Sequence, residues 1–241
     1  KSYEGVLPGL NPVLQMGTEP HAWANWLRTK EVEIPEQHFK LYTNKIEGTE
    51  YEDGGATPLG LALPKELNDT PFMVEKVIDY ISGQRDSWCV HLSLLRPHPP
   101  WIAPEPFNRM YPPAELMKFN RKERKVDEAS QHPFLNEFLN KTGYQAPEDD
   151  KKLARLKASY FGLMSEVDQN LGVLFDCLKK NDFWNNTLII FTSDHGEQIG
   201  DHWLLGKLGY FDESYHIPLI IRDPSNHQNK GKIIEEYTES V

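Results

Sequence analysis

The stretch "TSDHGEQIGDHWLLGK" (residues 192–207) places two aspartates, two histidines, a glutamate and a lysine at the end of the apolar run "TLIIF". Asp194 and His195 are adjacent, and a carboxylate beside an imidazole supplies two ligands of a divalent metal site. Gly196 permits the tight turn that would aim both side chains at one point. A simpler arrangement also fits, in which Asp194 caps a following helix and His195 is merely exposed. Spacing alone therefore makes this pair a candidate metal site without deciding the matter.

Two further side chains could act on an anionic group. Lys207 lies among apolar residues and glycines in "LLGKLGYF", where a lysine either extends its charge into solvent or faces an anion. His98 is held between prolines in "RPHPPW", and a rigid backbone suits an imidazole that donates a proton, although such loops also occur without chemistry. Glu197, Asp201 and His202 either orient metal ligands or form a solvated face.

Periodicity and apolar runs predict the elements that position these residues. Apolar residues recur every three or four positions from about Asp149 to Lys180, which predicts one long helix. Shorter helices are predicted at residues 21–29 and from Thr70, with Thr70 as N-cap and Pro71 at the first helical position. Apolar, β-rich runs predict strands at residues 88–95, 186–194 and 217–223. Residues 1–70 are predicted to be rich in loops, and prolines make residues 96–150 a proline-rich insertion.

The order of these elements predicts an α/β fold. The long connection from the strand at 88–95 to the strand at 186–194 favours parallel pairing. Because the apolar runs do not alternate with polar residues, we expect a mostly parallel or mixed sheet sandwiched by helices on both faces. Ligands of such sheets collect beyond the carboxyl ends of the strands. His98 and Asp194, which follow two of these strands, are therefore predicted to be neighbours.

Composition excludes some classes of partner. The net charge of -10 argues against a general nucleic-acid binder, which needs a basic face, and no apolar run is long enough to span a membrane. Cys89 and Cys177 are predicted to be small buried apolar residues rather than a disulfide. That usage fits a reducing compartment, so we expect a cytoplasmic protein. A homo-oligomer stays open.

Two segments together resemble a known family. "YFGLMSEVDQNLGVLFDCLKKNDFWNNTLIIFTSDHGEQIGDHWLLGKLGYFDESYHIPLIIRDP" (160–224) resembles the sulfatase and phosphonate monoester hydrolase branch of the alkaline phosphatase superfamily. "HLSLLRPHPPWIAPEPF" (91–107) matches the other recognisable segment of that family, in the family's order.

The resemblance implies roles for four residues. Asp194 and His195 would bind a divalent cation, Mn²⁺ or Ca²⁺. Lys207 would contact the non-bridging oxygens and the leaving oxygen of a sulfate or phosphoryl group, and His98 would stabilise or protonate the leaving group. A metal, an ammonium and an imidazole stabilise the negative charge that such a transition state develops.

The sequence also departs from the family. The family's nucleophile lies in a Cys/Ser-x-Pro-x-Arg motif and is converted to formylglycine, and neither Cys89, Cys177 nor any serine has that context. We therefore expect the formylglycine and the remaining metal carboxylates to lie outside this chain. On this interpretation residues 1–241 form a single partial sulfatase-type catalytic domain, inactive by itself.

The predicted function is a metal-dependent hydrolase of small anionic esters. The forms "RPHPP" and "GDHWLLGK" favour phosphonate monoesters or phosphodiesters over aryl sulfates, and an arylsulfatase remains the first alternative. The second is a non-catalytic relative that keeps the fold but only binds. Intact Lys207 and His98 weigh against that alternative, because a binding module has little need of both.

Overall fold

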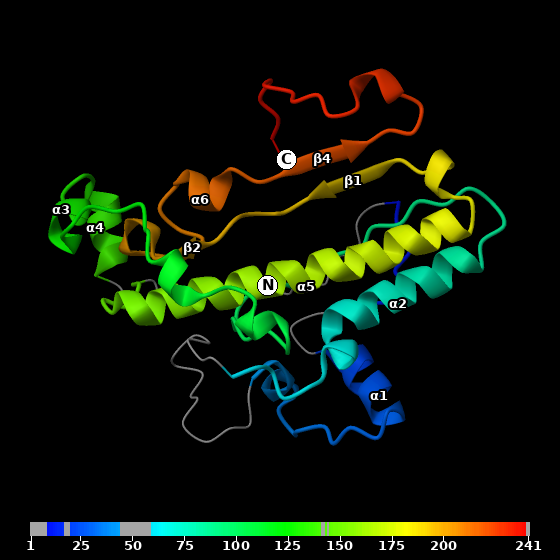
Figure 1. Ribbon diagram of the computed structural model, residues 1–241, viewed down its shortest axis with the longest axis horizontal. Coiled ribbons are helices and arrows are strands. Elements are labelled where there is room, and N and C mark those ends of the chain that lie inside the picture. The colour runs from blue at the N-terminus through cyan, green and yellow to red at the C-terminus, as the bar shows by residue number, and fades with distance from the viewer. Residues whose placement is uncertain (1–8, 17–19, 44–58, 141–142, 144, 240–241) are drawn as a thin grey trace. The chain divides into compact units, whose positions relative to one another are not determined.

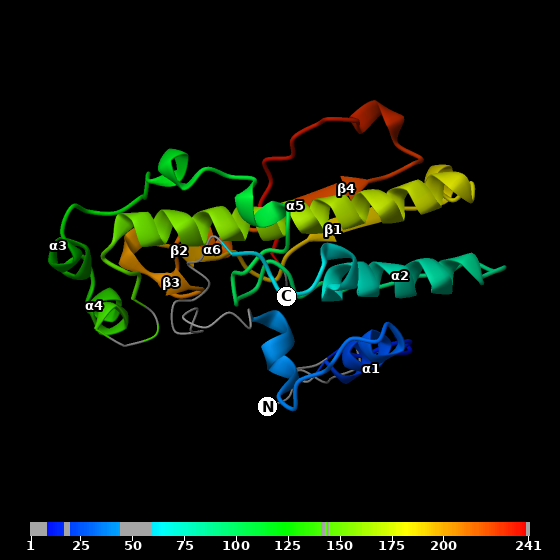
Figure 2. The same cartoon turned by 60° about the horizontal axis from the view of Figure 1, so that its bottom comes forward.

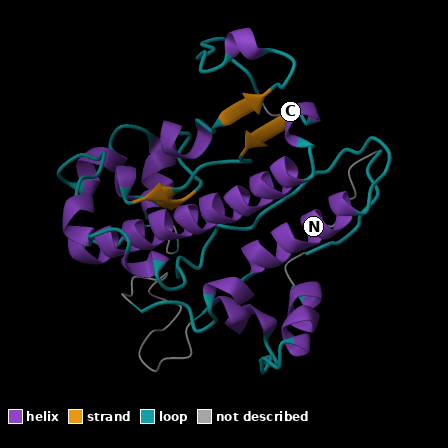
Figure 3. Cartoon of the chain, turned by 45° about the vertical axis from the view of Figure 1, so that its right-hand side comes forward, coloured by secondary structure: helices purple, strands orange, loops and turns teal. Residues whose placement is uncertain are grey.

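The computed structural model describes residues 9–16, 20–43, 59–140, 143 and 145–239 (Figure 1). The chain forms two compact units, Lys1–Leu116 with Ala154–Leu174 and Met117–Leu153 with Phe175–Val241. Its helices are α1 (His21–Thr29), α2 (Asp69–Ser82), α3 (Lys125–Ala129), α4 (Pro133–Leu139), α5 (Asp150–Lys180) and α6 (Asp212–Tyr215). Its strands are β1 (Ile189–Thr192), β2 (Gln198–Ile199), β3 (Leu205–Gly206) and β4 (Leu219–Arg222). Helices thus make up most of the regular structure (Figure 3).

The first unit is built around an aromatic and aliphatic cluster. The fully buried cluster members come from α1, α2 and the 3₁₀ turn His38–Tyr42, namely Trp23, Ala24, Leu27, Leu41, Tyr42 and Phe72. The indole nitrogen of Trp23 donates to the carbonyl oxygen of Leu67 at 2.9 Å, so its one polar atom is satisfied within the apolar cluster. Helix α1 has the predicted bounds. The predicted loop-rich segment 1–70 lies partly outside the described residues.

Helix α2 begins two residues earlier than predicted. Its N-cap is Asn68, not Thr70, and Pro71 occupies the third helical position. Proline is tolerated there because the first four N–H groups of a helix have no partner within the helix. The side chain of Asn68 makes no capping bond and donates instead to Glu166 at 3.0 Å.

Helix α5 confirms the predicted long helix. Asp149 is the N-cap, and its carboxylate accepts hydrogen bonds from the backbone N–H groups of Lys151 and Lys152. The apolar face is fully buried at Leu156 and Leu163. Gly162 lets the helix approach another backbone closely, since a Cβ there would lie 2.5 Å from the carbonyl oxygen of Phe107.

The predicted parallel sheet is wrong for the described residues. Strands β1 and β4 confirm two of the predicted strands, but they pair antiparallel, with Ile190 opposite Ile221 (Figure 1). Residues 88–95 form no strand and belong to the other unit. A run of apolar residues indicates a preference for extended backbone, but it does not identify the pairing partner.

The prediction that these strands are covered on both faces also fails within the described residues. Most apolar residues of β1 and β4 are 38 to 62% exposed, namely Ile190, Phe191, Leu219, Ile220 and Ile221.

Two further expectations concern single residues and the membrane. Cys89 is exposed and Cys177 is half-buried, so the prediction of two buried cysteines is wrong for Cys89. None of the helices in the described part of the chain has the length and apolar character that crossing a bilayer requires.

Candidate active site

Asp194 and His195 lie in a turn directly after β1. The backbone N–H of His195 donates to Asp194 Oδ1 at 3.0 Å, and Ser193 Oγ donates to the carbonyl oxygen of His195 at 2.7 Å. Gly196 is required here by close approach rather than by an unusual backbone angle. Its N–H donates to the Ser214 carbonyl at 2.7 Å, and a Cβ would lie 2.1 Å from the Glu213 carbonyl oxygen.

The geometry of this pair suits a shared cation. His195 Nδ1 lies 2.8 Å from the carbonyl oxygen of Gly196, which can only accept, so Nδ1 carries the proton. In the neutral ring Nε2 then presents a lone pair, and it lies 3.5 Å from Asp194 Oδ2. Two electron-pair donors that face each other at this distance are stabilised by a positive charge between or beside them. The prediction of an Asp-His metal pair fits these contacts.

Asp194 and His195 would supply only part of a metal site. Across the described ranges no group of three or more His, Cys, Asp or Glu side chains is arranged to hold a metal ion. Catalytic zinc sites use about three protein ligands, and Ca²⁺ takes still more oxygens. The donor set is therefore chemically suitable but lacks a third ligand within the residues described.

Lys207 and Glu197 form an ion pair beside this turn. Strands β2 and β3 pair antiparallel with Gln198 opposite Gly206 (Figure 2), so the flanking residues Glu197 and Lys207 also lie opposite each other. Lys207 Nζ is 3.6 Å from Glu197 Oε2, and the side chains are 31% and 4% exposed. The hairpin therefore converts the spacing of these residues into a contact.

Glu197 carries a buried carboxyl whose pKa is raised. Burial raises its pKa above the ordinary value, while Lys207 and His195 lower it and Asp194 raises it further. Glu197 pairs with Lys207, and its Oε1 has no hydrogen-bond partner. Asp194 and His195 precede Glu197 by three and two residues, so the turn and the ion pair place the candidate residues near this carboxyl. The prediction of a solvated face is wrong for Glu197, whose side chain is 4% exposed, and its role in orienting metal ligands stays a prediction.

His202 is engaged elsewhere in the second unit. Its Nδ1 lies 2.9 Å from Glu128 Oε1, its Nε2 lies 3.4 Å from Glu213 Oε2, and its ring stacks on Phe211 at 3.5 Å. Burial alone would raise the pKa of Glu128, but hydrogen bonds from the Lys122 N–H and the His202 and Gln131 side chains hold it below its usual value.

Asp201 likewise anchors the chain, because its carboxylate accepts from the Asn120 N–H at 2.6 Å. Asp201 and His202 therefore fix the loop that leads to Lys207 and do not touch the metal pair. Glu128 has no sequence signal, since it lies 74 residues from its histidine partner.

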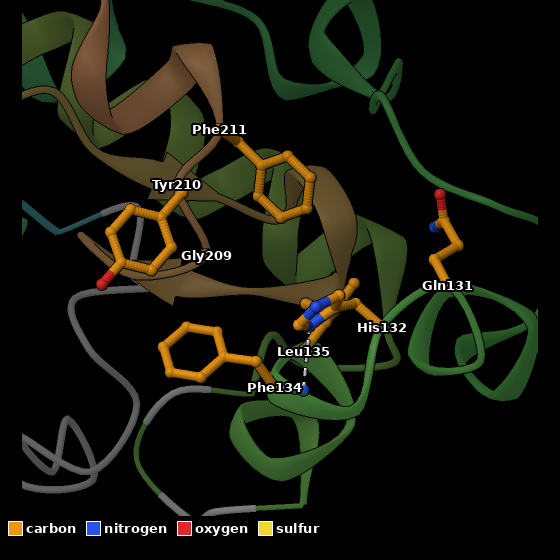
Figure 4. A pocket seen from close by; sticks show the side chains of 7 residues that line it. All are labelled: Gln131, His132, Phe134, Leu135, Gly209, Tyr210 and Phe211. Atoms are coloured by element: carbon orange, nitrogen blue, oxygen red, sulfur yellow. Dashed lines mark hydrogen bonds between the residues drawn. The ribbon is translucent and has the colours of Figure 1, made fainter.

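The second unit contains a pocket of about 540 Å³ (Figure 4). Residues 131–135 and 209–211 line it, and its side chains include the rings of His132, Phe134, Tyr210 and Phe211. The rings of Phe134 and Tyr210 lie 5.4 Å apart. The pocket is largely apolar, and its lining includes none of Asp194, His195 and Lys207.

His98 belongs to the first unit and is described within it. Its side chain is exposed, its Nδ1 lies 2.8 Å from the Pro99 carbonyl oxygen, and its N–H donates to the Leu95 carbonyl at 3.0 Å. The loop is thus ordered by its own backbone, as the prolines predict. That His98 converges with Asp194 stays a prediction.

Known proteins resemble most of this chain. The protein PehA of Trinickia caryophylli, a multifunctional alkaline phosphatase superfamily protein, is 34% identical over 98% of this chain and 48% of its own length. An arylsulfatase of Clostridium perfringens is 28% identical over 73% of the chain and 36% of its own length. The chain thus spans about half, or less, of the length of these curated relatives.

Solved structures agree with this similarity. The phosphonate monoester hydrolase of Agrobacterium radiobacter superposes with a TM-score of 0.84 at 36% identity, over 93% of this chain and 45% of that one. The phosphonate monoester hydrolase of Silicibacter pomeroyi gives 0.74 at 30% identity, over 85% and 42%. The sequence pattern of the Sulfatase family matches residues 34–241, which extends the similarity into the segment before residue 91. The chain therefore belongs to the Sulfatase family, within the alkaline phosphatase superfamily.

Proposed function

We propose that the protein containing this chain is a metal-dependent hydrolase of phosphonate monoesters and phosphodiesters. The observation that carries the proposal is the contact of His195 Nε2 with Asp194 Oδ2 at 3.5 Å, in the turn that leads to the ion pair of the buried Glu197 with Lys207. Support for the substrate class comes from two phosphonate monoester hydrolases that superpose over 93% and 85% of the chain. Sulfate esters are the alternative, favoured by the similarity to an arylsulfatase.

Each residue has a distinct task in this proposal. Asp194 and His195 hold the divalent metal, which when bound supplies Lewis-acid polarisation of the ester. The imidazole ligand favours Mn²⁺ over Ca²⁺, because Ca²⁺ prefers oxygen ligands. Lys207 directs its ammonium at the non-bridging and leaving oxygens, where negative charge develops. Glu197 fixes the direction of Lys207 through the 3.6 Å ion pair.

His98 stabilises or protonates the leaving oxygen. We place the formylglycine nucleophile outside the residues of this chain, so the covalent step does not use Cys89 or Cys177. The substrate is a small anionic ester, and the positive charges of the metal and Lys207 offset the net negative charge of the chain at this point.

The test is a set of assays on the complete protein, supplied with Mn²⁺ or Ca²⁺. We expect saturable hydrolysis of an aryl phosphonate monoester and an aryl phosphodiester, with a higher kcat/KM than for an aryl sulfate. Asp194→Ala should abolish it. Asp176→Ala is the matched control, because Asp176 is an exposed carboxylate of the same unit that pairs only with Lys179 among the described residues.

Other outcomes would replace the proposal. A higher kcat/KM for the aryl sulfate would make the protein a sulfate ester hydrolase. Binding of metal and of all three esters without turnover would identify a non-catalytic relative.

A further inference from the structure

Arg96 is buried, although it begins the 96–100 loop that carries the exposed His98. Its side chain is 2% exposed, whereas His98 two residues later is exposed. Arg96 Nη1 donates to the carbonyl oxygen of His98 at 3.2 Å and to that of Pro100 at 3.1 Å. One guanidinium nitrogen therefore holds the chain on both sides of Pro99. The His98 ring in turn contacts the Pro99 carbonyl between these two anchor points.

The guanidinium is fixed from the opposite side by α2. Arg96 Nε lies 3.4 Å from Asp69 Oδ1, and the Asp69 side chain is 3% exposed in the first turn of that helix. The guanidinium carbon lies over the Tyr42 ring, 4.7 Å from the ring centroid. A planar fork with a carboxylate, two carbonyls and an aromatic ring around it has one orientation that satisfies all four.

A second buried carboxylate completes the cluster from α5. Glu166 is 1% exposed and accepts from Asn68 Nδ2 at 3.0 Å, which links α5 to the start of α2. Burial and the charge of Asp69 raise the pKa of Glu166 to about 7, against the hydrogen bond from Asn68 and the charge of Arg96. The 96–100 loop is therefore anchored to α2 through Asp69, and the start of α2 is linked to α5 through Asn68 and Glu166.

We propose that Arg96, held by Asp69, is a positioning residue that fixes the direction of the His98 imidazole toward the leaving group. The inference rests on the proposed function, because it gives His98 its task. Lysine cannot substitute, since a compact ammonium lacks the fork that reaches the carboxylate and both carbonyls together. Small errors in the position of an acid reduce proton transfer more than they reduce substrate binding.

The experiment compares Arg96→Lys, His98→Ala and the double variant in the complete protein, on aryl esters whose leaving groups span a range of pKa. His98→Ala should lower kcat by about 10² to 10⁴ for the poorest leaving group and less for the best. Arg96→Lys should lower kcat by about tenfold or more with the same leaving-group trend, and should leave KM within about twofold.

The double variant decides whether Arg96 acts through His98. We expect no loss beyond that of His98→Ala, because a positioning residue has nothing left to position. Equal losses from Arg96→Lys with and without His98 would show an independent, structural role. The control Arg109→Lys changes an exposed arginine of the same unit, 69% exposed and paired with Glu105 at 3.1 Å, and should behave as wild type.

We call the Asp69–Arg96 pair, with the bonds of Arg96 to the 96–100 loop, the Arg96 clamp. Failure of the Arg96 clamp and failure of the proposed function give different results. Wild-type turnover with a sensitive His98→Ala and an unaffected Arg96→Lys overturns the clamp alone. No turnover by wild type, or an unaffected His98→Ala, overturns the function assigned to the protein or to His98. If Arg96→Lys does not fold, Asp69→Asn serves instead, since it keeps the shape and removes the charge. Its loss should follow the leaving group and disappear without His98, and a loss that persists would overturn the proposal.

Discussion

Two turns carry the residues assigned to chemistry, and they are held in opposite ways. The 96–100 loop is anchored by a buried arginine that reaches a carboxylate 27 residues away. In the 193–196 turn, the hydrogen bonds of the Asp194 and His195 side chains go to residues of the turn itself, and the Asp194 side chain is 85% exposed. The first turn has its geometry set by the fold. The second has two electron-pair donors facing each other, so a bound cation would set its final geometry.

The contrast matches the two kinds of task. A proton donor must be in place before the ester arrives, and its supports are buried charges that cost several kcal/mol to disturb. A metal ligand is fixed by the metal itself, whose binding free energy can order an exposed turn. Removing a support should therefore affect stability in the first turn and metal content in the second.

The largest effect is expected at Lys207 in the complete protein. Lys207→Ala should lower turnover by about 10² to 10⁴, as loss of one charge stabiliser of a transition state does, and should leave metal content unchanged. Asp194→Ala should lower metal content and turnover together, because its carboxylate supplies both charge and geometry. Metal analysis and steady-state kinetics measure both. Equal metal loss in the two variants would mean that Lys207 supports the turn rather than the reaction.

The buried Arg96 clamp should contribute more to the free energy of unfolding than the exposed turn at Asp194 does. Arg96→Met leaves Asp69 buried, 3% exposed, without its positive partner, and we expect a loss of about 3–5 kcal/mol in the free energy of unfolding. Asp194→Ala in metal-free protein should change it by no more than about 0.5 kcal/mol, as exposed substitutions do. Denaturant titration compares the two. Similar losses would show that the turns are held alike and remove the contrast.

Sequence patterns predicted elements better than their pairing. The bounds of α1 and the extent of α5 could be predicted because helical periodicity is local. The direction of strand pairing could not, since an apolar run is equally compatible with either direction. Asp194, His195 and Lys207 are predicted from residue type and the family resemblance. Arg96, Asp69 and Glu166 were missed because their partners are distant along the chain, and no local pattern distinguishes a buried charge from a solvated one.

The buried carboxyl of Glu166 should make the free energy of unfolding depend on pH. Burial raises the pKa of Glu166 from 4.5 to about 7, so the folded chain binds this proton more tightly than the unfolded chain. The free energy of unfolding should therefore fall as pH rises from about 4.5 to about 7, by at most about 3 kcal/mol, and then level.

Glu166→Gln tests this directly, because glutamine still accepts from Asn68 but never ionises. The variant should lose the slope and be more stable than wild type by about 2 kcal/mol at pH 8, with little difference at pH 5. The exposed Glu115→Gln is the control and should keep the wild-type slope. A slope that persists in Glu166→Gln would assign it to another group.

The smallest effect is expected where the second turn begins. Strand β1 leads into that turn with Ile190 58% exposed, whereas Ile81 of α2 is 1% exposed. Ile190→Thr keeps a β-branched side chain, so strand preference is retained and the free energy of unfolding should change by no more than about 0.5 kcal/mol. It should also reduce the binding of an apolar dye, because exposed apolar patches attract such ligands.

Ile81→Thr should instead lower the free energy of unfolding by more than about 1.5 kcal/mol, since it removes buried apolar surface and buries a hydroxyl. If both changes cost the same, β1 is covered in solution, and the second turn is anchored as firmly as the first.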